Sequence, residues 1–427
     1  MSKVDFIAEL TWRGMLHDIV PGTQDLLKKE SVSGYIGFDP TADSLGIGHL
    51  AQIMTLLHFQ KAGHTPIVLI GGATGMVGDP SGKKEERNLL DADTLNHNVA
   101  CIKDQLSKFL DFKQPSNAAV MVNNYDWFKD YKFLDFIRDV GKHITISYML
   151  AKDSVQKRLE AGMSFTEFSY QLVQGYDFYW LRTNMNVKLQ MGGSDQWGNI
   201  VTGTEFIRRK SGLDAYALTT KLITKADGSK FGKSESGNIW LDASKTSPYQ
   251  FYQFWLRCAD EDAISFIKIF TLLSQKDIEE MILKHQNAPH ERLLQHALAQ
   301  DITRRVHGED ALNKAKMATK VLFGKSTIED LSFLDEKTLE SAFEKHNHFS
   351  ISSSLIKEGI LIQDLLAIHT PILASKGEAK RMIKNNGISI KKEKITMEDD
   401  CINTQHLLHN KYLFVQKGKE FYLISAQ

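Results

Sequence analysis

The first half of the chain alternates between short apolar runs and longer segments with helical periodicity, and this alternation constrains the fold more than any other feature. The apolar runs lie at 34–38, 66–71, 118–122 and 187–191. The helical segments lie at 49–62, 95–110, 133–140 and 164–183. Strands that alternate with helices predict a mainly parallel sheet covered by helices, in which ligands bind beyond the carboxyl ends of the strands.

The second half has a different character. Glycine becomes sparse and helical periodicity dominates from about residue 247, which predicts a helical domain. A serine-rich segment at 349–354 is typical of a linker, and strand-like runs at 412–415 and 421–424 close a small mixed module. With 427 residues, the chain is long enough for several domains. The predicted domains span 1–246, 247–348 and 349–427.

Charge and cysteine usage exclude some classes of protein. Lys plus Arg equal Asp plus Glu at 52 each, so the chain is not a small, wholly basic nucleic-acid-binding module, although a local basic face remains compatible with a nucleic-acid partner. Cys101, Cys258 and Cys401 lie far apart, which argues against a zinc ribbon and against a disulfide framework. Unpaired cysteines favour a cytoplasmic location.

The N-terminus has no targeting signal in its pattern. Residues 1–20 contain charges at Asp5, Glu9, Arg13 and Asp18, which predicts an amphipathic helix and not a secretory signal. The chain contains no uncharged apolar run long enough to span a bilayer, so we expect no membrane association.

Three glycine-rich polar clusters follow predicted strands or lie in loops. They are GFDPTADSLGIGH at 37–49, GGATGMVGDPSGKK at 71–84 and KADGSKFGKSESG at 225–237. Glycines allow the backbone to approach a ligand, and His49 would stand at a helix start, near the positive end of the helix dipole. The lysines of the second and third clusters suit a polyphosphate, although the second does not match the P-loop pattern. Taken alone, the first cluster is better explained as plain turn chemistry, and a cluster like the third is more often a solvated surface loop.

In this order, the clusters resemble the signature motifs of the class I aminoacyl-tRNA synthetases, usually written His-Ile-Gly-His and Lys-Met-Ser-Lys-Ser. Further segments resemble the bacterial tyrosine branch of that family: 37–45, 75–83, NNYDW at 123–127, SFTEFSYQ at 164–171 and GGSDQWGN at 192–199. The resemblance covers essentially the whole chain. It implies an α/β fold with a Rossmann-like parallel-sheet catalytic domain, then a helical domain on the anticodon side, then a small α+β S4-like RNA-binding domain.

The resemblance implies a pocket for tyrosine. The residues that it assigns to tyrosine binding are Tyr35, Asp79, Asn124, Tyr170, Gln174, Asp177 and Gln190. In the family, the phenol is bound by residues matching Tyr35 and Asp177. The α-amino group is bound by residues matching Asp79, Tyr170 and Gln174. Tyr170, Gln174 and Asp177 lie at i, i+4 and i+7 of one predicted helix, so they share a face. A site that hydrogen-bonds the phenol rejects phenylalanine by leaving its polar groups unpaired.

The resemblance also implies an ATP site and a reaction. Residues assigned to ATP or the adenylate are Gly37, Asp39, Gly48, His49, Gly193, Asp195, Gln196 and Lys233. Candidates for catalysis are Thr41, His49, Lys83, Arg87, Lys230 and Lys233. The implied reaction is in-line attack of the tyrosine carboxylate on the α-phosphate, followed by transfer of tyrosine to the 3′ end of tRNA(Tyr). The carboxylate is already ionised, so catalysis depends on positioning and on stabilising the leaving pyrophosphate.

One position departs from the family pattern. Gly46 stands where the signature normally has its first histidine, so half of the usual imidazole pair is missing. This departure supports one alternative, a catalytically weakened synthetase-like RNA-binding protein. An aminoacyl-tRNA synthetase for tryptophan is a further alternative. Asp177 disfavours it, because an unpaired carboxylate beside an indole would be costly to bury.

The C-terminal module carries basic residues at helical spacing, in SKGEAKRMIKNNGISI at 375–390. This segment resembles the S4-type domain that ends bacterial tyrosine enzymes, and the predicted tRNA-binding residues are Lys376, Lys380, Arg381 and Lys384. A solvated lysine face is the ordinary interpretation of such a run, and phosphate contact is favoured here by the preceding synthetase-like body. The family also implies a homodimer and Mg²⁺ accompanying ATP. No carboxylate cluster predicts a metal bound by the protein itself.

Overall fold

The computed structural model describes residues 4–79, 90–152, 155–156, 162–229, 231–234, 237–323, 330–331, 333–343 and 347–427. It divides into two compact units, Met1–Lys245 with Arg257–Ile302, and Thr246–Leu256 with Thr303–Gln427. The helices predicted as a separate domain at 247–348 are therefore shared between the two units. The three-domain division stays a prediction.

The first unit is built on a six-stranded sheet, counted within the described residues, with the order β1-β6-β5-β2-β3-β4. Its strands are β1 (Leu16–Ile19), β2 (Ser33–Phe38), β3 (Thr65–Ile70), β4 (Val120–Asn123), β5 (Leu189–Gly193) and β6 (Tyr216–Thr220). All neighbouring strands pair in parallel except β1 and β6. The four predicted apolar runs became β2, β3, β4 and β5, so the predicted parallel sheet is confirmed.

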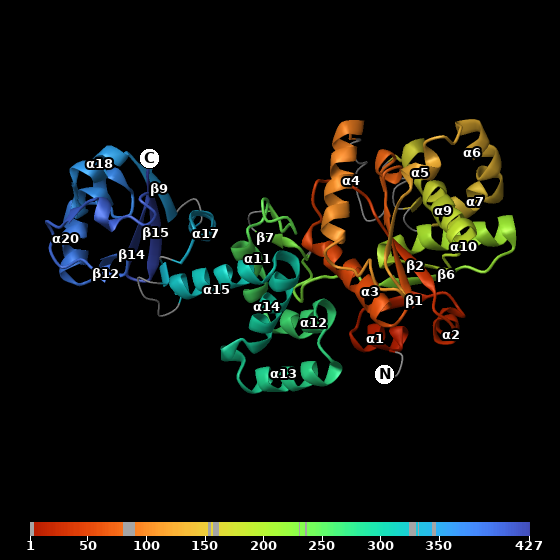
Figure 1. Cartoon of the computed structure of the whole chain (residues 1–427), viewed down its shortest axis with the longest axis horizontal. Coiled ribbons are helices and arrows are strands. Elements are labelled where there is room, and N and C mark those ends of the chain that lie inside the picture. The colour runs from red at the N-terminus through yellow and green to blue at the C-terminus, as the bar shows by residue number, and fades with distance from the viewer. Residues whose placement is uncertain are drawn as a thin grey trace. The chain divides into compact units, whose positions relative to one another are not determined.

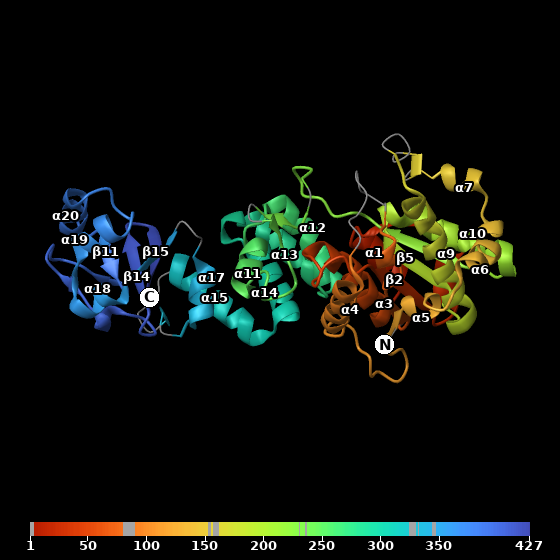
Figure 2. The ribbon, with the colours of Figure 1, turned by 90° about the horizontal axis from the view of Figure 1, so that it is seen from above.

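Helices cover both faces of this sheet, with α3 and α4 on one side and α9 and α10 on the other (Figure 1, Figure 2). Their bounds are α1 (Phe6–Trp12), α2 (Thr23–Lys29), α3 (Leu50–Lys61), α4 (Ala92–Leu106), α5 (Tyr125–Phe128), α6 (Phe133–Asp139), α7 (Ile146–Leu150), α9 (Phe165–Met185) and α10 (Trp197–Ser211). The side-chain alternation of β2 sets the layers. Gly34 lies against Phe59 of α3, while its neighbour Tyr35 packs with Phe178 and Leu181 of α9.

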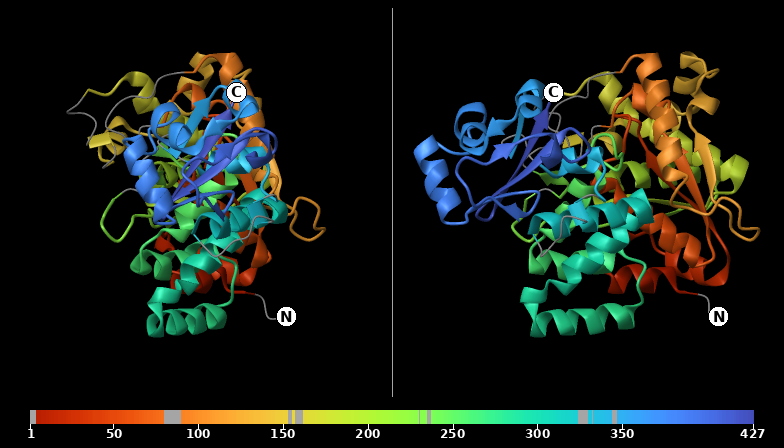
Figure 3. Two further views of the ribbon diagram at one scale, coloured as in Figure 1. Left: turned by 90° about the vertical axis from the view of Figure 1, so that its left-hand side faces the viewer. Right: turned by 60° about the vertical axis from the view of Figure 1, so that its left-hand side comes forward.

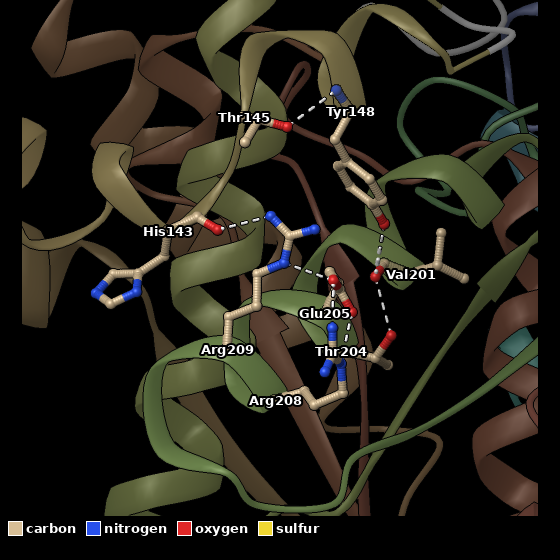
Figure 4. Close-up of polar contacts among 8 residues, drawn as sticks. All are labelled: His143, Thr145, Tyr148, Val201, Thr204, Glu205, Arg208 and Arg209. Carbon is tan, nitrogen blue, oxygen red and sulfur yellow. Dashed lines mark hydrogen bonds and ion pairs between the residues drawn. The ribbon is translucent and has the colours of Figure 1, made fainter.

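Helix α10 holds the segment that carries α6 and α7 (Figure 4). Arg209 donates a hydrogen bond to the carbonyl oxygen of His143 at 3.1 Å, and the Tyr148 hydroxyl donates to the carbonyl oxygen of Val201 at 3.3 Å. Glu205 pairs with Arg208 and Arg209, and these hydrogen bonds lower the pKa of Glu205 to about 2. The segment is thus fixed to the first unit by side chains that lie far away in the sequence.

The N-terminal segment corrects a prediction. Residues 1–20 were expected to form one amphipathic helix, but α1 ends at Trp12 and residues 16–19 form β1. Gly14 adopts a φ of +74°, a conformation that glycine reaches without steric cost and that reverses the chain after the helix. Pairing with β6, from about 200 residues later, then makes the segment a strand; the His17 ring nitrogen lies 3.2 Å from the Thr219 hydroxyl.

The remaining helices of the chain are α11 (Pro248–Leu256), α12 (Asp260–Phe270), α13 (Gln275–Asn287), α14 (Leu293–His307), α15 (Glu309–Phe323) and α17 (Glu336–Ala342). The helical periodicity predicted from about residue 247 is therefore confirmed. Arg13 attaches α1 to the end of α12, because its guanidinium, only 3% exposed, donates to the carbonyl oxygens of Thr271 and Leu273 at 2.9 and 2.7 Å.

A second sheet lies in the C-terminal module, with the order β12-β11-β14-β15-β9. Its strands are β9 (His348–Ile351), β11 (Ile388–Ile390), β12 (Glu393–Lys394), β14 (Tyr412–Lys417) and β15 (Glu420–Ala426). Helices α18 (Ser353–Glu358), α19 (Ile362–Asp364) and α20 (Lys376–Lys384) lie along one side of it (Figure 3). Leu413 and Val415 face these helices in one apolar core, and Phe414, on the opposite face, contacts Phe343 after α17.

The serine-rich segment is not a linker in the structure. Residues 348–351 form β9, which pairs in parallel with β15, and the Ser352 side chain caps α18. The sequence favoured a linker because β9 is short and its partner strand, β15, lies about 70 residues later. The residues around β9 therefore carry no local pattern that predicts the pairing. Within the described residues, no helix is both long enough and apolar enough to cross a membrane.

Candidate active site

The carboxyl ends of β2, β3, β4 and β5 bring together four polar turns. The sheet order places β2 between β5 and β3, so the turns after these strands lie side by side. They begin at Asp39, Gly71, Asn124 and Ser194. From β2 the chain continues to β3 on one side, and β5 lies on the other side of β2. Open α/β sheets bind ligands where the strand order reverses in this way, beyond the carboxyl ends of the strands. We call this region, between the turns after β2, β3, β4 and β5, the crevice.

Asp177, on α9, is 1% exposed and lies beside the turn that follows β4, where Asn124 contacts it. Its two oxygens accept hydrogen bonds from different donors, Asn124 Nδ2 at 3.0 Å and Trp127 Nε1 at 2.8 Å. Burial raises the pKa of Asp177 to about 8, although both hydrogen bonds oppose this shift. Trp127 also stacks on Trp180, with 4.3 Å between ring centroids, so its indole is held in place. Sequence reasoning gave Trp127 no role.

Tyr35 and Gln190 face the same crevice from neighbouring strands. They are paired in the register of β2 with β5 and are 1% and 2% exposed. The Tyr35 hydroxyl and Gln190 Oε1 are buried with no hydrogen-bond partner among the described residues. Burial, and secondarily the charge of Asp177, raises the pKa of Tyr35 well above its usual value, so the hydroxyl keeps its proton. Two polar groups are thus available to a buried polar ligand beside Asp177.

A second carboxylate, Asp39, directly follows β2. Its Oδ2 accepts from the Tyr170 hydroxyl at 2.9 Å and its Oδ1 from the Thr74 hydroxyl at 2.7 Å. Thr74 in turn accepts from Asn124 Nδ2 at 3.1 Å, which joins Asp39 to Asp177 in one network. A β-carbon at Gly71 would lie 2.1 Å from Asp39 Oδ1, so only glycine fits there. Thr74 was missed because a threonine in a glycine-rich turn has an ordinary local explanation.

Asp79, Asp195 and Gln196 form the third part of the crevice. Gln196 Nε2 donates to Asp79 Oδ2 at 2.7 Å, and Gln174 Nε2 lies 3.5 Å from Gln196 Oε1. Burial, followed by the charge of Asp79, raises the pKa of Asp195. A β-carbon at Gly193 would lie 2.6 Å from Asp195 Oδ1. Tyr170, Gln174 and Asp177 contact Asp39, Gln196 and Asn124, respectively, and their role in tyrosine binding stays a prediction.

The first and third glycine-rich clusters meet, although about 190 residues separate them. Gly46 pairs with Trp240 in an isolated bridge, and Ile47 N donates to the carbonyl oxygen of Ile239 at 2.8 Å. Gly232 has a φ of +90°, and a β-carbon there would lie 2.9 Å from Ile47 Cγ2. This close approach brings the backbone of β7 (Lys233–Ser234), which pairs with β8 (Gly237–Asn238), beside the turn.

The turn that precedes α3 is open to solvent. His49 is exposed and its Nδ1 lies 3.1 Å from the carbonyl oxygen of Gly46, while Thr41, Gly37 and Gly48 are also exposed. Gly46 has φ −81° and ψ +163°, ordinary extended backbone. The predicted residues Lys83, Arg87 and Lys230 lie outside the described residues, as does the side chain of Lys233. The described part of the chain holds no group of three or more His, Cys, Asp or Glu side chains able to bind a metal ion.

The predicted tRNA-binding residues lie together on α20. Lys376, Lys380, Arg381 and Lys384 are all exposed. Lys376 pairs with Asp364 at 2.6 Å, and Lys380 and Lys384 pair with Glu398 at 3.3 and 3.8 Å. The lysine face is therefore partly neutralised within its own module, which the sequence did not predict.

Comparisons with known proteins agree with this architecture. A family model described as tRNA synthetases class I (W and Y) matches residues 27–324. The chain belongs to the class I tRNA synthetases. A second family model, a tyrosine–tRNA ligase SYY-like C-terminal domain, matches residues 339–425 of this synthetase.

Individual relatives cover the whole synthetase. A tyrosine–tRNA ligase of Bacteroides fragilis is 57% identical over 430 residues, covering 99% of this chain and all of the relative. One of Cytophaga hutchinsonii is 58% identical over 422 residues, covering 98% and 99%. Among solved structures, a C-terminally truncated mitochondrial tyrosyl-tRNA synthetase of Aspergillus nidulans has a TM-score of 0.68 and 32% identity, covering 75% of this chain and 94% of that one.

Proposed function

We propose that this synthetase is a tyrosine–tRNA ligase, which forms tyrosyl-adenylate from L-tyrosine and ATP and then esterifies tRNA(Tyr). The observation that carries the proposal is the buried group of Tyr35, Asp177 and Gln190 in the crevice. A phenol inserted there donates to Asp177 and accepts from the Tyr35 hydroxyl. A phenylalanine side chain would satisfy neither group, and buried polar groups without partners are costly.

The rest of the crevice supports activation at its outer end. Asp79, Tyr170 and Gln174 suit the α-amino group of tyrosine, because a cation there lies among carboxylate, hydroxyl and amide oxygens. The tyrosine carboxylate then points toward the open turn at Thr41 and His49, where the ATP phosphates bind. Asp195 and Gln196 line the adenylate. Lysines of the second and third glycine-rich clusters stabilise the departing pyrophosphate, with Mg²⁺ arriving on ATP.

Tyrosine-dependent ATP–pyrophosphate exchange tests the function. Among the standard amino acids at equal concentration, tyrosine is expected to drive exchange and phenylalanine to give none above background. Equal exchange with phenylalanine would contradict the proposal that Tyr35 and Asp177 bind the phenol of tyrosine. Tight tRNA binding without any exchange would support a non-catalytic RNA-binding protein instead.

The C-terminal sheet is proposed to serve tRNA and not activation. A chain that stops at residue 347, before β9, is expected to form tyrosyl-adenylate at the parent rate but to lose tRNA charging, because the basic helix α20 goes with the sheet. Adenylate formation and charging are measured on the same preparation, and thermal unfolding checks that the shortened protein is folded. Full charging by the shortened protein would make the module dispensable.

The synthetase is further proposed to act as a cytoplasmic homodimer. Its three cysteines are free, as expected in the cytoplasm. Large apolar side chains are exposed on and beside α6, α7 and the start of α9, including Phe133, Leu134, Ile146 and Phe165 at 65%, 77%, 67% and 65%. Such exposure on helices that α10 holds rigidly is typical of an interface (Figure 4).

Charge substitution on these helices tests the dimer. Leu134→Asp is expected to convert a dimer at micromolar concentration into a monomer, measured by sedimentation velocity. Phe323→Asp, at an equally exposed phenylalanine on α15 (66%), is the control and should leave the dimer intact. A parent protein that sediments as a monomer would contradict the proposal.

A further inference from the structure

The lysines of α20 pair with acidic side chains of their own module. Lys376, Lys380 and Lys384 are spaced four residues apart, so they form one stripe along the helix. Each of them is paired: Lys376 with Asp364, and the other two with the single carboxylate of Glu398. The two acids are less exposed than the lysines, at 26% and 36% of their side chains, which indicates that the lysines lie over them.

The segment that carries Glu398 is fixed in place. It connects β12 to β13 (Cys401–Ile402), which pairs with β10 (Ile360–Leu361) beside α19. The segment forms a turn in which Asp400 N donates to the carbonyl oxygen of Met397. Ile362 N, at the start of α19, donates to the carbonyl oxygen of Asp400 at 2.9 Å. The backbone that carries Glu398 is therefore tied to β10 and to the start of α19.

We propose that Glu398 is an internal competitor for RNA, which occupies Lys380 and Lys384 until RNA phosphates displace it. The inference rests on the proposed tRNA-binding function. Exposed ion pairs are weak, so a well-placed phosphate exchanges with Glu398 readily. An RNA that fits the module poorly gains too few other contacts to offset the exchange, and weak nonspecific binding is suppressed.

Glu398→Gln in the full-length synthetase is the direct test, with affinities for tRNA(Tyr) and for a non-cognate tRNA measured across a salt series. Freeing two lysines for phosphate contact is expected to tighten binding of both RNAs about five- to twentyfold near 0.1 M salt, and to steepen the dependence on salt by about one to two counterions. Tyrosine-dependent pyrophosphate exchange is expected to stay at the parent rate.

Asp399→Asn is the matched control, because Asp399 is the next residue, is exposed and forms no ion pair within the described residues. It removes the same charge from the same segment without releasing a lysine. A second control places Glu398→Gln in a Lys380→Gln, Lys384→Gln background, where no tightening is expected.

Two results would overturn the inference: equal affinities for the Glu398→Gln and Asp399→Asn proteins, or tightening that persists without the two lysines. Failure of the proposed function has a different signature, because the parent protein would then bind tRNA(Tyr) no better than non-cognate RNA and would show no tyrosine-dependent exchange.

Discussion

Asp177→Asn is expected to lower kcat/KM for tyrosine about 10- to 150-fold in pyrophosphate exchange above pH 8, where the carboxyl is ionised, since a hydrogen bond to a charged group contributes about 1.5–3 kcal/mol. The value for phenylalanine should change little, so discrimination between the two amino acids falls by the same factor. The reason is geometric as well as electrostatic. Both oxygens of Asp177 already accept from Asn124 and Trp127, so either orientation of an amide puts its NH₂ group against a donor.

The same mismatch between the amide NH₂ and a donor is expected to lower the free energy of unfolding of the ligand-free protein. One buried donor, on Asn124 or Trp127, loses its acceptor, which costs about 1–3 kcal/mol in the free energy of unfolding. Denaturant unfolding measures this cost. Asp126→Asn is the control, because Asp126 lies on α5 beside Trp127 but is exposed, and it should change neither selectivity nor stability. A tyrosine-to-phenylalanine ratio unchanged in Asp177→Asn would place the phenol elsewhere.

Gly46→His is expected to accelerate formation of tyrosyl-adenylate by roughly two to three powers of ten, because a preorganised donor near the leaving pyrophosphate typically contributes about 3–4 kcal/mol. The structure allows the change. Gly46 has ordinary extended dihedral angles, and among the described residues a β-carbon there would meet only Ile239 O at 3.6 Å and His49 Nδ1 at 4.0 Å. Tyrosine affinity should stay the same, because the proposed phenol contacts, Tyr35 and Asp177, are buried, whereas this turn is exposed at Gly48 and His49.

Single-turnover measurement of adenylate formation decides this prediction, with Gly46→Ala as the control for the added β-carbon. If the histidine protein is no faster than the alanine protein, then His49, Thr41 and the loop lysines already supply the stabilisation. The missing signature histidine would then be compensated in this synthetase.

Much of the fold follows from local periodicity. Apolar runs of strand length between helical segments predicted β2, β3, β4 and β5. Strands buried on both faces, such as β3 and β5, need apolar residues throughout, whereas the edge strand β4 is only partly buried. The same periodicity failed at residues 16–19, where a strand is created by pairing with β6 and not by its own pattern. The segment 348–351 failed for the same reason, since its partner is the last strand of the chain.

For the site, the sequence by itself determined which residues share a face or a turn: the spacing of Tyr170, Gln174 and Asp177 on one helix fixes their common direction. Only the tertiary structure decided what each group contacts. Thr74 reaches Asp39 across 35 residues, and Trp127 reaches Asp177 across 50. Glu398 neutralises lysines that local spacing assigned to RNA. Hydrogen bonds and ion pairs of this kind depend on distances that folding sets, so no local pattern encodes them.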